Sequence, residues 1–220
     1  MTNLNQQILK FDYEQNFKDQ DFYVSKSNKY VFDFLSLWQK RKKNFVNIIG
    51  DKLSGKTHLM NIFLKKNKGI RLESNSLKDY DFRKLKIYEN IILENLTSEI
   101  DEKILYSLFN IIEQDNKYII VTSLKPIVNL NFNLEDLKSR AKNFLLLEIE
   151  KPDDELIFAI ILKNLSDRQI SIDNKLINYI IKRIERSYSK IYDLIYKIDQ
   201  LSLKKKKSID LKIVKEVLGD

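Results

Sequence analysis

Eight consecutive residues of this 220-residue sequence carry its clearest chemistry. They fit the pattern G-x-x-x-x-G-K-[ST] without a mismatch, and they are Gly50, Asp51, Lys52, Leu53, Ser54, Gly55, Lys56 and Thr57. In such a loop the glycines let backbone N–H groups surround a phosphate, the lysine neutralises the β- and γ-phosphates, and the hydroxyl is offered to Mg²⁺. The segment predicts a site for ATP or ADP with Mg²⁺. His58 follows directly and is counted with the site, although packing on a helix is its simplest role.

A nucleotide site of this kind also needs an acid at the end of a neighbouring strand, to hold Mg²⁺ through water. The apolar run 90–93 is followed by Glu94 and Asn95. Glu94 is the candidate metal residue, although an apolar strand that ends in one acid is common. Asn95 stands where a second acid would orient the attacking water, and an amide cannot accept a proton as a carboxylate does. We therefore expect weak or absent intrinsic hydrolysis.

A strand before the loop and a helix after it must position these groups. The continuous apolar run 45–49 predicts a strand covered on both faces, and residues 56–66 predict a helix. The alternation of strands and helices predicts an α/β fold, a three-layer domain with a mostly parallel, five-stranded sheet. The other expected strands are 70–73, 90–93, 118–122 and 144–148, and the other expected helices are 28–42, capped by Ser27 or Asn28, and 101–114.

The pattern changes after Pro152, where no strand is evident. Four helices are expected there, over 153–166, 173–186, 189–203 and 209–218. The sequence therefore predicts three parts: an N-terminal tail over 1–15, the α/β domain over 16–152 and a small all-α domain over 153–220.

The composition limits the classes of function. The chain is 43% apolar and 32% charged, which is typical of a soluble globular protein. No apolar run reaches the roughly 18 residues of a membrane span, and the first ten residues lack the apolar centre of a secretory signal. The absence of cysteine and the single histidine exclude disulfides, thiolate metal sites and histidine-rich metal centres. A cytoplasmic protein without a membrane partner is the simplest expectation.

The formal net charge of +8 is concentrated near the C-terminus. Residues 156–220 contain 14 Lys/Arg and 8 Asp/Glu and so carry +6, whereas the rest of the chain carries +2. A basic surface of this kind can approach DNA or an acidic partner. The run 204–207 of four lysines fits a solvated turn better than a DNA contact.

These motifs together resemble the AAA+ ATPases, and within them the family of the bacterial initiator DnaA and its short paralogue Hda. The stretch 50–59 (GDKLSGKTHL) resembles the phosphate loop of that family, and 21–28, which ends at Asn28, resembles the segment along the adenine. Thr122 and Ser123 match the sensor of the γ-phosphate. The stretch 137–140 (LKSR) resembles the segment that carries an arginine finger, and the resemblance implies that Arg140 acts on a neighbouring subunit. The alternative is that Arg140 is solvated or pairs with a local acid such as Glu135 or Asp136.

Two departures from the family pattern stand out. Lys190 falls where the helical lid carries a sensor arginine, and a point charge does not replace the arginine fork. Asn95 is the second departure, and it weakens the expectation of autonomous ATPase activity. The sequence ends at Asp220, where DnaA continues into a DNA-binding domain, and this favours the Hda-like branch.

The N-terminal tail contains a further candidate motif. Gln6, Leu9 and Phe11 resemble the Q-x-x-L-x-[LF] peptide with which bacterial proteins dock on the DNA polymerase sliding clamp. An extended segment can place Leu9 and Phe11 in an apolar pocket while Gln6 hydrogen-bonds at its edge. An ordinary tail with a few apolar residues is the alternative.

The resemblance implies a regulator of replication initiation that carries ADP or ATP, sits on the clamp and promotes ATP hydrolysis by DnaA in trans. DNA contact through the basic helices and a homodimer stay open as further interactions. A self-sufficient AAA+ ATPase that acts on DNA or loads a helicase is the alternative function. A small-molecule P-loop kinase is a third, which fits less well because the helical region follows the sheet domain instead of being inserted into it.

Overall fold

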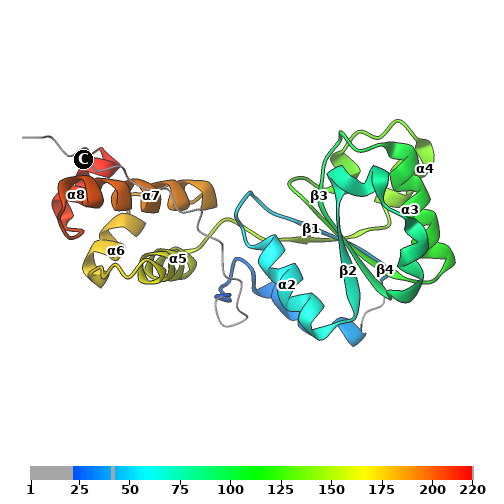
Figure 1. Cartoon of the computed structure of the whole chain (residues 1–220), viewed down its shortest axis with the longest axis horizontal. Helices are drawn as coiled ribbons and strands as arrows, with labels where there is room; N and C mark the ends of the chain where they lie inside the picture. The colour runs from blue at the N-terminus through cyan, green and yellow to red at the C-terminus, as the bar shows by residue number, and fades with distance from the viewer. Residues whose placement is uncertain (1–21, 41–42, 220) are drawn as a thin grey trace, which may run out of the picture.

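The computed structural model describes residues 22–40 and 43–219 (Figure 1). Its centre is a five-stranded sheet in the order β2-β3-β4-β1-β5, in which every pair of neighbours is parallel. The strands are β1 (Phe45–Ile49), β2 (Gly69–Glu73), β3 (Asn90–Leu96), β4 (Tyr118–Ser123) and β5 (Leu145–Glu148). The predicted three-layer parallel domain is thereby confirmed.

The side chains of each strand alternate between two apolar layers, as the pleat of a strand requires. On β3, Ile91 and Leu93 pack with α3 (Glu102–Gln114) and α4 (Glu135–Ala141). Ile92, between them, packs on the opposite face with α1 (Lys29–Ser36) and α2 (Lys56–Lys66). Helices therefore cover both faces of the sheet, with α2 on one side and α3 and α4 on the other (Figure 1).

Short 3₁₀ helices complete the connections of this domain. They are η2 (Trp38–Lys40), η3 (Ser74–Asp79), η4 (Phe82–Ile87) and η5 (Ile127–Asn129). Parallel strands end at a common edge, so the loop after β1 and the ends of β3 and β4 meet there. This is the edge at which open α/β sheets bind ligands.

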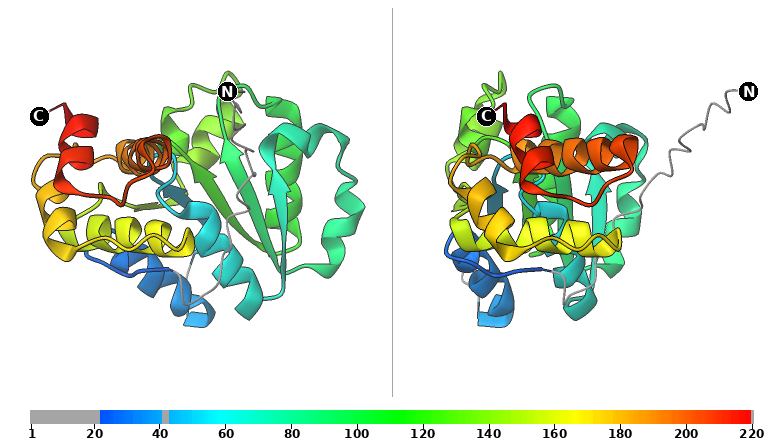
Figure 2. Two further views of the ribbon diagram at one scale, coloured as in Figure 1. Left: turned by 60° about the vertical axis from the view of Figure 1, so that its left-hand side comes forward. Right: turned by 90° about the vertical axis from the view of Figure 1, so that its left-hand side faces the viewer.

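The C-terminal part is a separate helical body with its own apolar core. It consists of α5 (Asp154–Asp167), α6 (Asn174–Ile181), α7 (Tyr188–Lys205) and α8 (Leu211–Leu218), grouped beside the sheet in Figure 2. The carboxylates of Asp153, Asp173 and Asp210 accept backbone N–H groups at the starts of α5, α6 and α8. Carboxylates at these positions satisfy N–H groups that the helix leaves unpaired. None of the helices in the described residues is long and apolar enough to cross a bilayer.

Two predicted helices end several residues earlier in the structure. The helix expected over 28–42 ends at Ser36, and Asn28 does not cap it through its side chain. That side chain serves the preceding loop instead: it accepts the Ser25 N–H and donates to the Tyr23 carbonyl. The helix expected over 173–186 ends at Ile181.

Contacts at the junction attach the helical body to the sheet domain. Asp153 caps α5 through Leu156 N (2.8 Å) and also accepts hydrogen bonds from the backbone N–H and hydroxyl of Ser27 (3.2 and 3.1 Å). Burial raises the pKa of this carboxyl, but the hydrogen bonds from Leu156, Ser25 and Ser27 outweigh it and the pKa is lowered overall. The junction therefore favours an ionised Asp153.

Candidate nucleotide-binding site

The loop between β1 and α2 favours glycine at both glycine positions of its motif, Gly50 and Gly55. A Cβ on Gly50 would lie 2.8 Å from Ser54 Oγ, closer than real Cβ atoms approach, and 3.1 Å from Ile149 Cβ, which is a tight contact. Gly55 has φ +92°, in the left-handed region that costs other residues strain. The backbone is thus tightly folded at both glycines, which leaves no side chain there to block the close approach that phosphate binding requires. The helix that follows, α2, begins at Lys56 and brings its positive end to the loop.

Lys56 lies inside the loop and is 8% exposed. Its ammonium group donates to the backbone carbonyl oxygens of Gly50 (2.7 Å) and Asp51 (2.8 Å). Burial lowers the pKa of Lys56, and the carboxylates of Asp51 and Glu94 offset part of that effect. A phosphate oxygen offers this desolvated cation a charged partner in place of neutral carbonyls, which favours anion binding.

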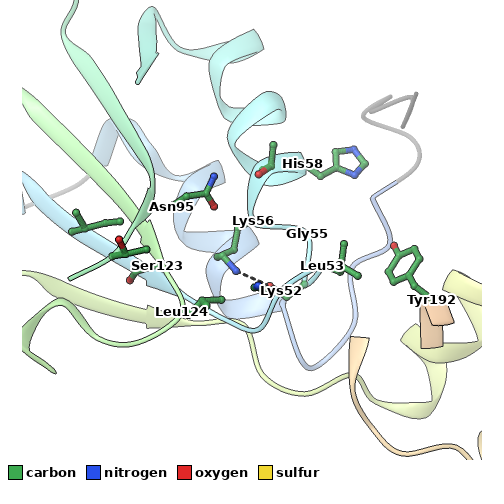
Figure 3. A pocket seen from close by; sticks show the side chains of 13 residues that line it. Lys52, Leu53, Gly55, Lys56, His58, Asn95, Ser123, Leu124 and Tyr192 are labelled. Atoms are coloured by element: carbon green, nitrogen blue, oxygen red, sulfur yellow. Dashed lines mark hydrogen bonds between the residues drawn. The ribbon is translucent and has the colours of Figure 1, made fainter. Parts of the chain in front are cut away.

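A pocket of about 540 Å³ lies over the loop (Figure 3). The sheet contributes Asn95 and Ser123 from the ends of β3 and β4, and α7 of the helical body contributes Tyr192 from another direction. The full lining is Lys52, Leu53, Ser54, Gly55, Lys56, Thr57, His58, Asn95, Leu96, Thr97, Ser123, Leu124 and Tyr192. The volume is within the usual range for small-molecule sites.

Glu94 is buried beside this pocket, with 1% of its surface exposed. Its Oε2 lies 3.2 Å from Arg71 Nε in an ion pair that lacks hydrogen-bond geometry, so neither carboxylate oxygen has a hydrogen-bond partner in the described residues. Burial raises the pKa of Glu94, whereas the Arg71 charge opposes that rise.

The residues present include the usual donors for a hydrated Mg²⁺. They would be the Thr57 hydroxyl and the Glu94 carboxylate, one oxygen of which already lies 3.2 Å from Arg71 Nε. Mg²⁺ keeps several waters and binds through one or two carboxylates together with substrate phosphates. Within the described chain no group of three acidic or histidine residues could hold a metal by itself, so the phosphates would have to supply the remaining ligands.

Asn95 occupies an irregularity in β3. Two residues, Glu94 and Asn95, fit between the register pairs Leu93–Val121 and Leu96–Ser123, and Asn95 has φ +58°. Asparagine tolerates this left-handed backbone better than most residues. Its N–H donates to Thr122 Oγ1 (3.1 Å) and its amide donates to Glu73 Oε2 (3.0 Å). An amide thus stands at the pocket where hydrolysis would need a proton acceptor.

The two sensor candidates differ in position. Ser123 lines the pocket, whereas Thr122 is not part of its lining and accepts the Asn95 N–H. The Ser123 hydroxyl donates to Lys125 O (2.7 Å) and accepts from the side chain of Asn47 (2.9 Å). Asn47 is a residue that the sequence analysis missed, and its signal was a polar side chain in the middle of the apolar run 45–49.

Asn28 and Lys190 are not brought into the pocket lining. Asn28 holds the loop before α1, as described above, and Lys190 is exposed. Tyr192, which follows Lys190 on α7, lines the pocket instead. Phe22 contacts the site indirectly: its ring packs edge-to-face on His58 at 5.3 Å and stacks on Phe32 at 5.9 Å.

Arg140 lies on the opposite face of the sheet, on α4. Its guanidinium donates to Asn110 Oδ1 (2.6 Å), pairs with Glu113 Oε2 (2.9 Å) and lies over the Tyr106 ring (5.3 Å). All three partners belong to α3, so the alternative of a local pair with Glu135 or Asp136 is not the one found; Glu135 pairs with Lys138. Arg140 is absent from the lining of this chain's own pocket.

The remaining sequence candidates lie elsewhere. Gln6, Leu9 and Phe11 are outside the described residues. Lys204 to Lys207 are exposed at the end of α7, where Lys206 adopts a left-handed cap with φ +51°, an arrangement that both a solvated turn and a DNA contact allow.

Comparison with known proteins adds two kinds of similarity. The family model described as Hda, lid domain, matches residues 153–218. Over 237 aligned residues the chain is 27% identical to the chromosomal replication initiator protein DnaA of Buchnera aphidicola subsp. Cinara cedri. The aligned region covers 96% of this chain and 54% of that protein. The chain thus spans about half the length of the DnaA relatives that it matches.

Solved structures share the fold. Domain III of the Thermotoga maritima replication initiation protein DnaA superposes with a TM-score of 0.72 at 18% identity, over 93% of this chain and 96% of that one. AMPPCP-bound DnaA from Aquifex aeolicus gives a TM-score of 0.65 at 20% identity, over 86% and 66%. The phosphate loop and the strand order agree with these similarities: the helical part matches the Hda lid-domain model, and the chain as a whole is similar to the AAA+ proteins of the DnaA/Hda type.

Proposed function

We propose that this chain is a nucleotide-binding regulator of replication initiation that works as Hda-like proteins do. The observation that carries the proposal is a phosphate loop beside which an amide stands in place of a second acid. Lys56 and Thr57 stand in a tightly folded loop beneath Tyr192 of the lid, while Asn95 places an amide, tied to Glu73, where hydrolysis would need an acid. Bound nucleotide, ADP or ATP, would then serve structure and sensing. The Aquifex aeolicus DnaA structure holds AMPPCP, which supports a nucleotide in this fold.

The chemistry that the chain promotes would take place in a partner. In the proposed arrangement Gln6, Leu9 and Phe11 dock on the sliding clamp, and Arg140 is presented to ATP held by DnaA. Arg140 suits a role in trans because it is on the face of the sheet opposite α2 and away from its own pocket. A finger supplied in trans contributes about 10³–10⁵ to the rate in GTPases, because it stabilises charge that develops on the phosphates.

Nucleotide binding is the first part to test. Fluorescent ADP and ATP analogues are titrated into the purified chain and into Lys56→Ala. We expect the variant to bind at least about tenfold more weakly, since it loses the charge–phosphate contact. Lys66→Ala is the matched control, because Lys66 is an exposed lysine at the other end of α2. Equal binding by the chain and Lys56→Ala would contradict the site.

Action in trans needs a reconstituted reaction. ATP-loaded DnaA, DNA-loaded clamp and this chain are mixed, and conversion of the DnaA-bound ATP to ADP is followed. We expect acceleration that is lost with Arg140→Ala and kept with Arg83→Ala, whose guanidinium is exposed and pairs with Asp81. Alanine at Gln6, Leu9 and Phe11 is expected to abolish retention on the clamp in a pulldown. No acceleration with confirmed clamp binding would reduce the proposal to an adaptor.

A self-sufficient ATPase acting on DNA is the second candidate. The observation in its favour is the exposed lysine run at the end of α7. It predicts hydrolysis by the chain alone, stimulated by single-stranded DNA and lost with Lys56→Ala. Asn95 opposes it, and a partner-free ATPase assay separates the two.

A further inference from the structure

Arg71 is a partly buried arginine that pairs with the buried Glu94 and is not part of the phosphate loop. It lies on β2, where the register pairs Arg71 with Ile92 and Glu73 with Glu94. These four side chains therefore share the face of the sheet that α2 covers, as Ile92 shows by its packing. Asn61 of α2 accepts a hydrogen bond from the Arg71 guanidinium, which fixes one end of the fork. The other end, Nε, lies 3.2 Å from Glu94.

The Glu94 carboxylate consequently has a permanent counter-charge. Arg71 is 29% exposed and Glu94 is 1% exposed, so this pair is less screened by water than a surface pair. Lys56 adds a second positive charge nearby, whereas Glu73 adds a negative one that is held by the Asn95 amide. A carboxylate removed from water needs such a partner, and here a protein cation supplies it.

A guanidinium and a Mg²⁺ ion compete for the same carboxylate. Mg²⁺ gives up its water reluctantly and would approach Glu94 with a fixed positive charge already 3.2 Å from one oxygen. Repulsion between the two cations and the shared negative charge both lower the gain from adding the metal. The positive charge that Mg²⁺ would bring to Glu94 is thus partly supplied by the Arg71 guanidinium.

We propose that Arg71 takes over the charge-balancing role of Mg²⁺ beside Glu94, so that this site binds a nucleoside diphosphate with little dependence on Mg²⁺. The inference rests on the nucleotide-binding part of the proposed function. It extends that function because it specifies the ligand form: a metal-free diphosphate is retained, as suits a chain in which bound nucleotide is not turned over.

The test is a titration of fluorescent ADP in excess Mg²⁺ and in EDTA. For the unaltered chain we expect dissociation constants within about threefold of each other. For Arg71→Met, which keeps the length of the side chain but removes its charge, we expect Mg²⁺ to tighten binding by about tenfold or more. Arg83→Met is the matched control, and it should behave as the unaltered chain does because Arg83 is at the surface.

Two further variants keep the test decisive if Arg71→Met does not fold, which far-UV circular dichroism would reveal. Arg71→Lys retains a charge without the fork and should show Mg²⁺ dependence between those of the unaltered chain and Arg71→Met. Glu94→Gln combined with Arg71→Met should remove the acquired dependence, since the metal would have no carboxylate to meet.

The outcomes are distinguishable. An unaltered chain whose ADP affinity falls about tenfold or more in EDTA would overturn the role of Arg71 and leave nucleotide binding intact. Equal insensitivity to Mg²⁺ in the unaltered chain and Arg71→Met would overturn it as well. Absence of ADP binding in both buffers, or binding that Lys56→Ala leaves unchanged, would instead contradict the proposed nucleotide site.

Discussion

The hydroxyl of Tyr188 donates a hydrogen bond to the backbone carbonyl oxygen of Glu150, 3.0 Å away. Tyr188 is the first residue of α7, yet it is 1% exposed and packs in the apolar layer that contains α1, α2 and one face of the sheet. Burial raises the pKa of this hydroxyl well above its ordinary value. The first turn of a lid helix is therefore anchored in the sheet domain, one turn before Tyr192 reaches the pocket.

Loss of this anchor should weaken the junction. Tyr188→Phe keeps the ring but leaves the Glu150 carbonyl without its partner, and we expect the free energy of unfolding to fall by about 1 kcal/mol. Urea denaturation followed by circular dichroism measures the change. Tyr196→Phe is the matched control, because Tyr196 is half exposed on the same helix. Equal stability of the two variants would show that the hydrogen bond contributes nothing.

Tyr192 should contribute to nucleotide affinity without contributing much to folding. Its ring lines the pocket over the phosphate loop, so Tyr192→Ala removes an apolar and aromatic wall. We expect fluorescent ADP to bind roughly fivefold more weakly, in line with a single aromatic contact. Tyr196→Ala serves as the control on the same helix. Unchanged affinity in Tyr192→Ala would place the nucleotide away from α7.

Asn47 should be important for stability because three hydrogen bonds converge on a side chain with 0% exposure. Its amide donates to Val121 O (3.1 Å) and Ser123 Oγ (2.9 Å), and its carbonyl accepts Ile127 N–H (2.8 Å). Asn47→Ala strands the buried Ile127 N–H, which costs about 1–3 kcal/mol of unfolding free energy.

The control for this prediction is Asn44→Ala. Asn44 hydrogen-bonds Asn116 near the surface (3.0 Å), where water can replace the lost partner. A denaturant titration should show a clear loss for Asn47→Ala and a change within about 0.5 kcal/mol for Asn44→Ala. Equal effects would mean that Asn47 does not tie β1 to the chain after β4.

The junction should also lose stability in acid. The pKa of Asp153 is lowered in the folded chain, so its ionised form contributes stability that is present above the ordinary aspartate value of about 3.9 and disappears as pH falls through the folded value. Asp153→Asn should therefore differ from the unaltered chain most at neutral pH and least in acid. Thermal unfolding between about pH 7 and pH 3 measures this convergence.

Asp173→Asn is the matched control for Asp153. Asp173 also caps a helix, through Lys175 N (2.8 Å), but that helix is α6, inside the helical body. This variant measures what the loss of a helix cap alone does to stability. A pH-independent difference for Asp153→Asn would show that the cap contributes through its shape and not through its charge.

Local patterns in the sequence determined the fold and the phosphate loop. The run 45–49 and the helix 56–66 were predicted with the bounds that the structure has, because strand and helix periodicity and the glycine spacing are properties of adjacent residues. The five-stranded parallel sheet followed from the order of elements. The expected cap at Asn28 was not formed, because its side chain hydrogen-bonds the loop before α1 instead of the helix.

Tertiary structure alone decided which side chains meet. Arg71 and Glu94 are 23 positions apart and become an ion pair only because β2 and β3 are neighbours in a particular register. Arg140 contacts α3 instead of its neighbours in sequence, and Tyr192 reaches the pocket instead of Lys190. The physical reason is the same in each case. Composition and periodicity fix which face of an element is apolar, whereas the partner of a charged or aromatic side chain depends on strand order, register and helix docking, which the whole fold sets.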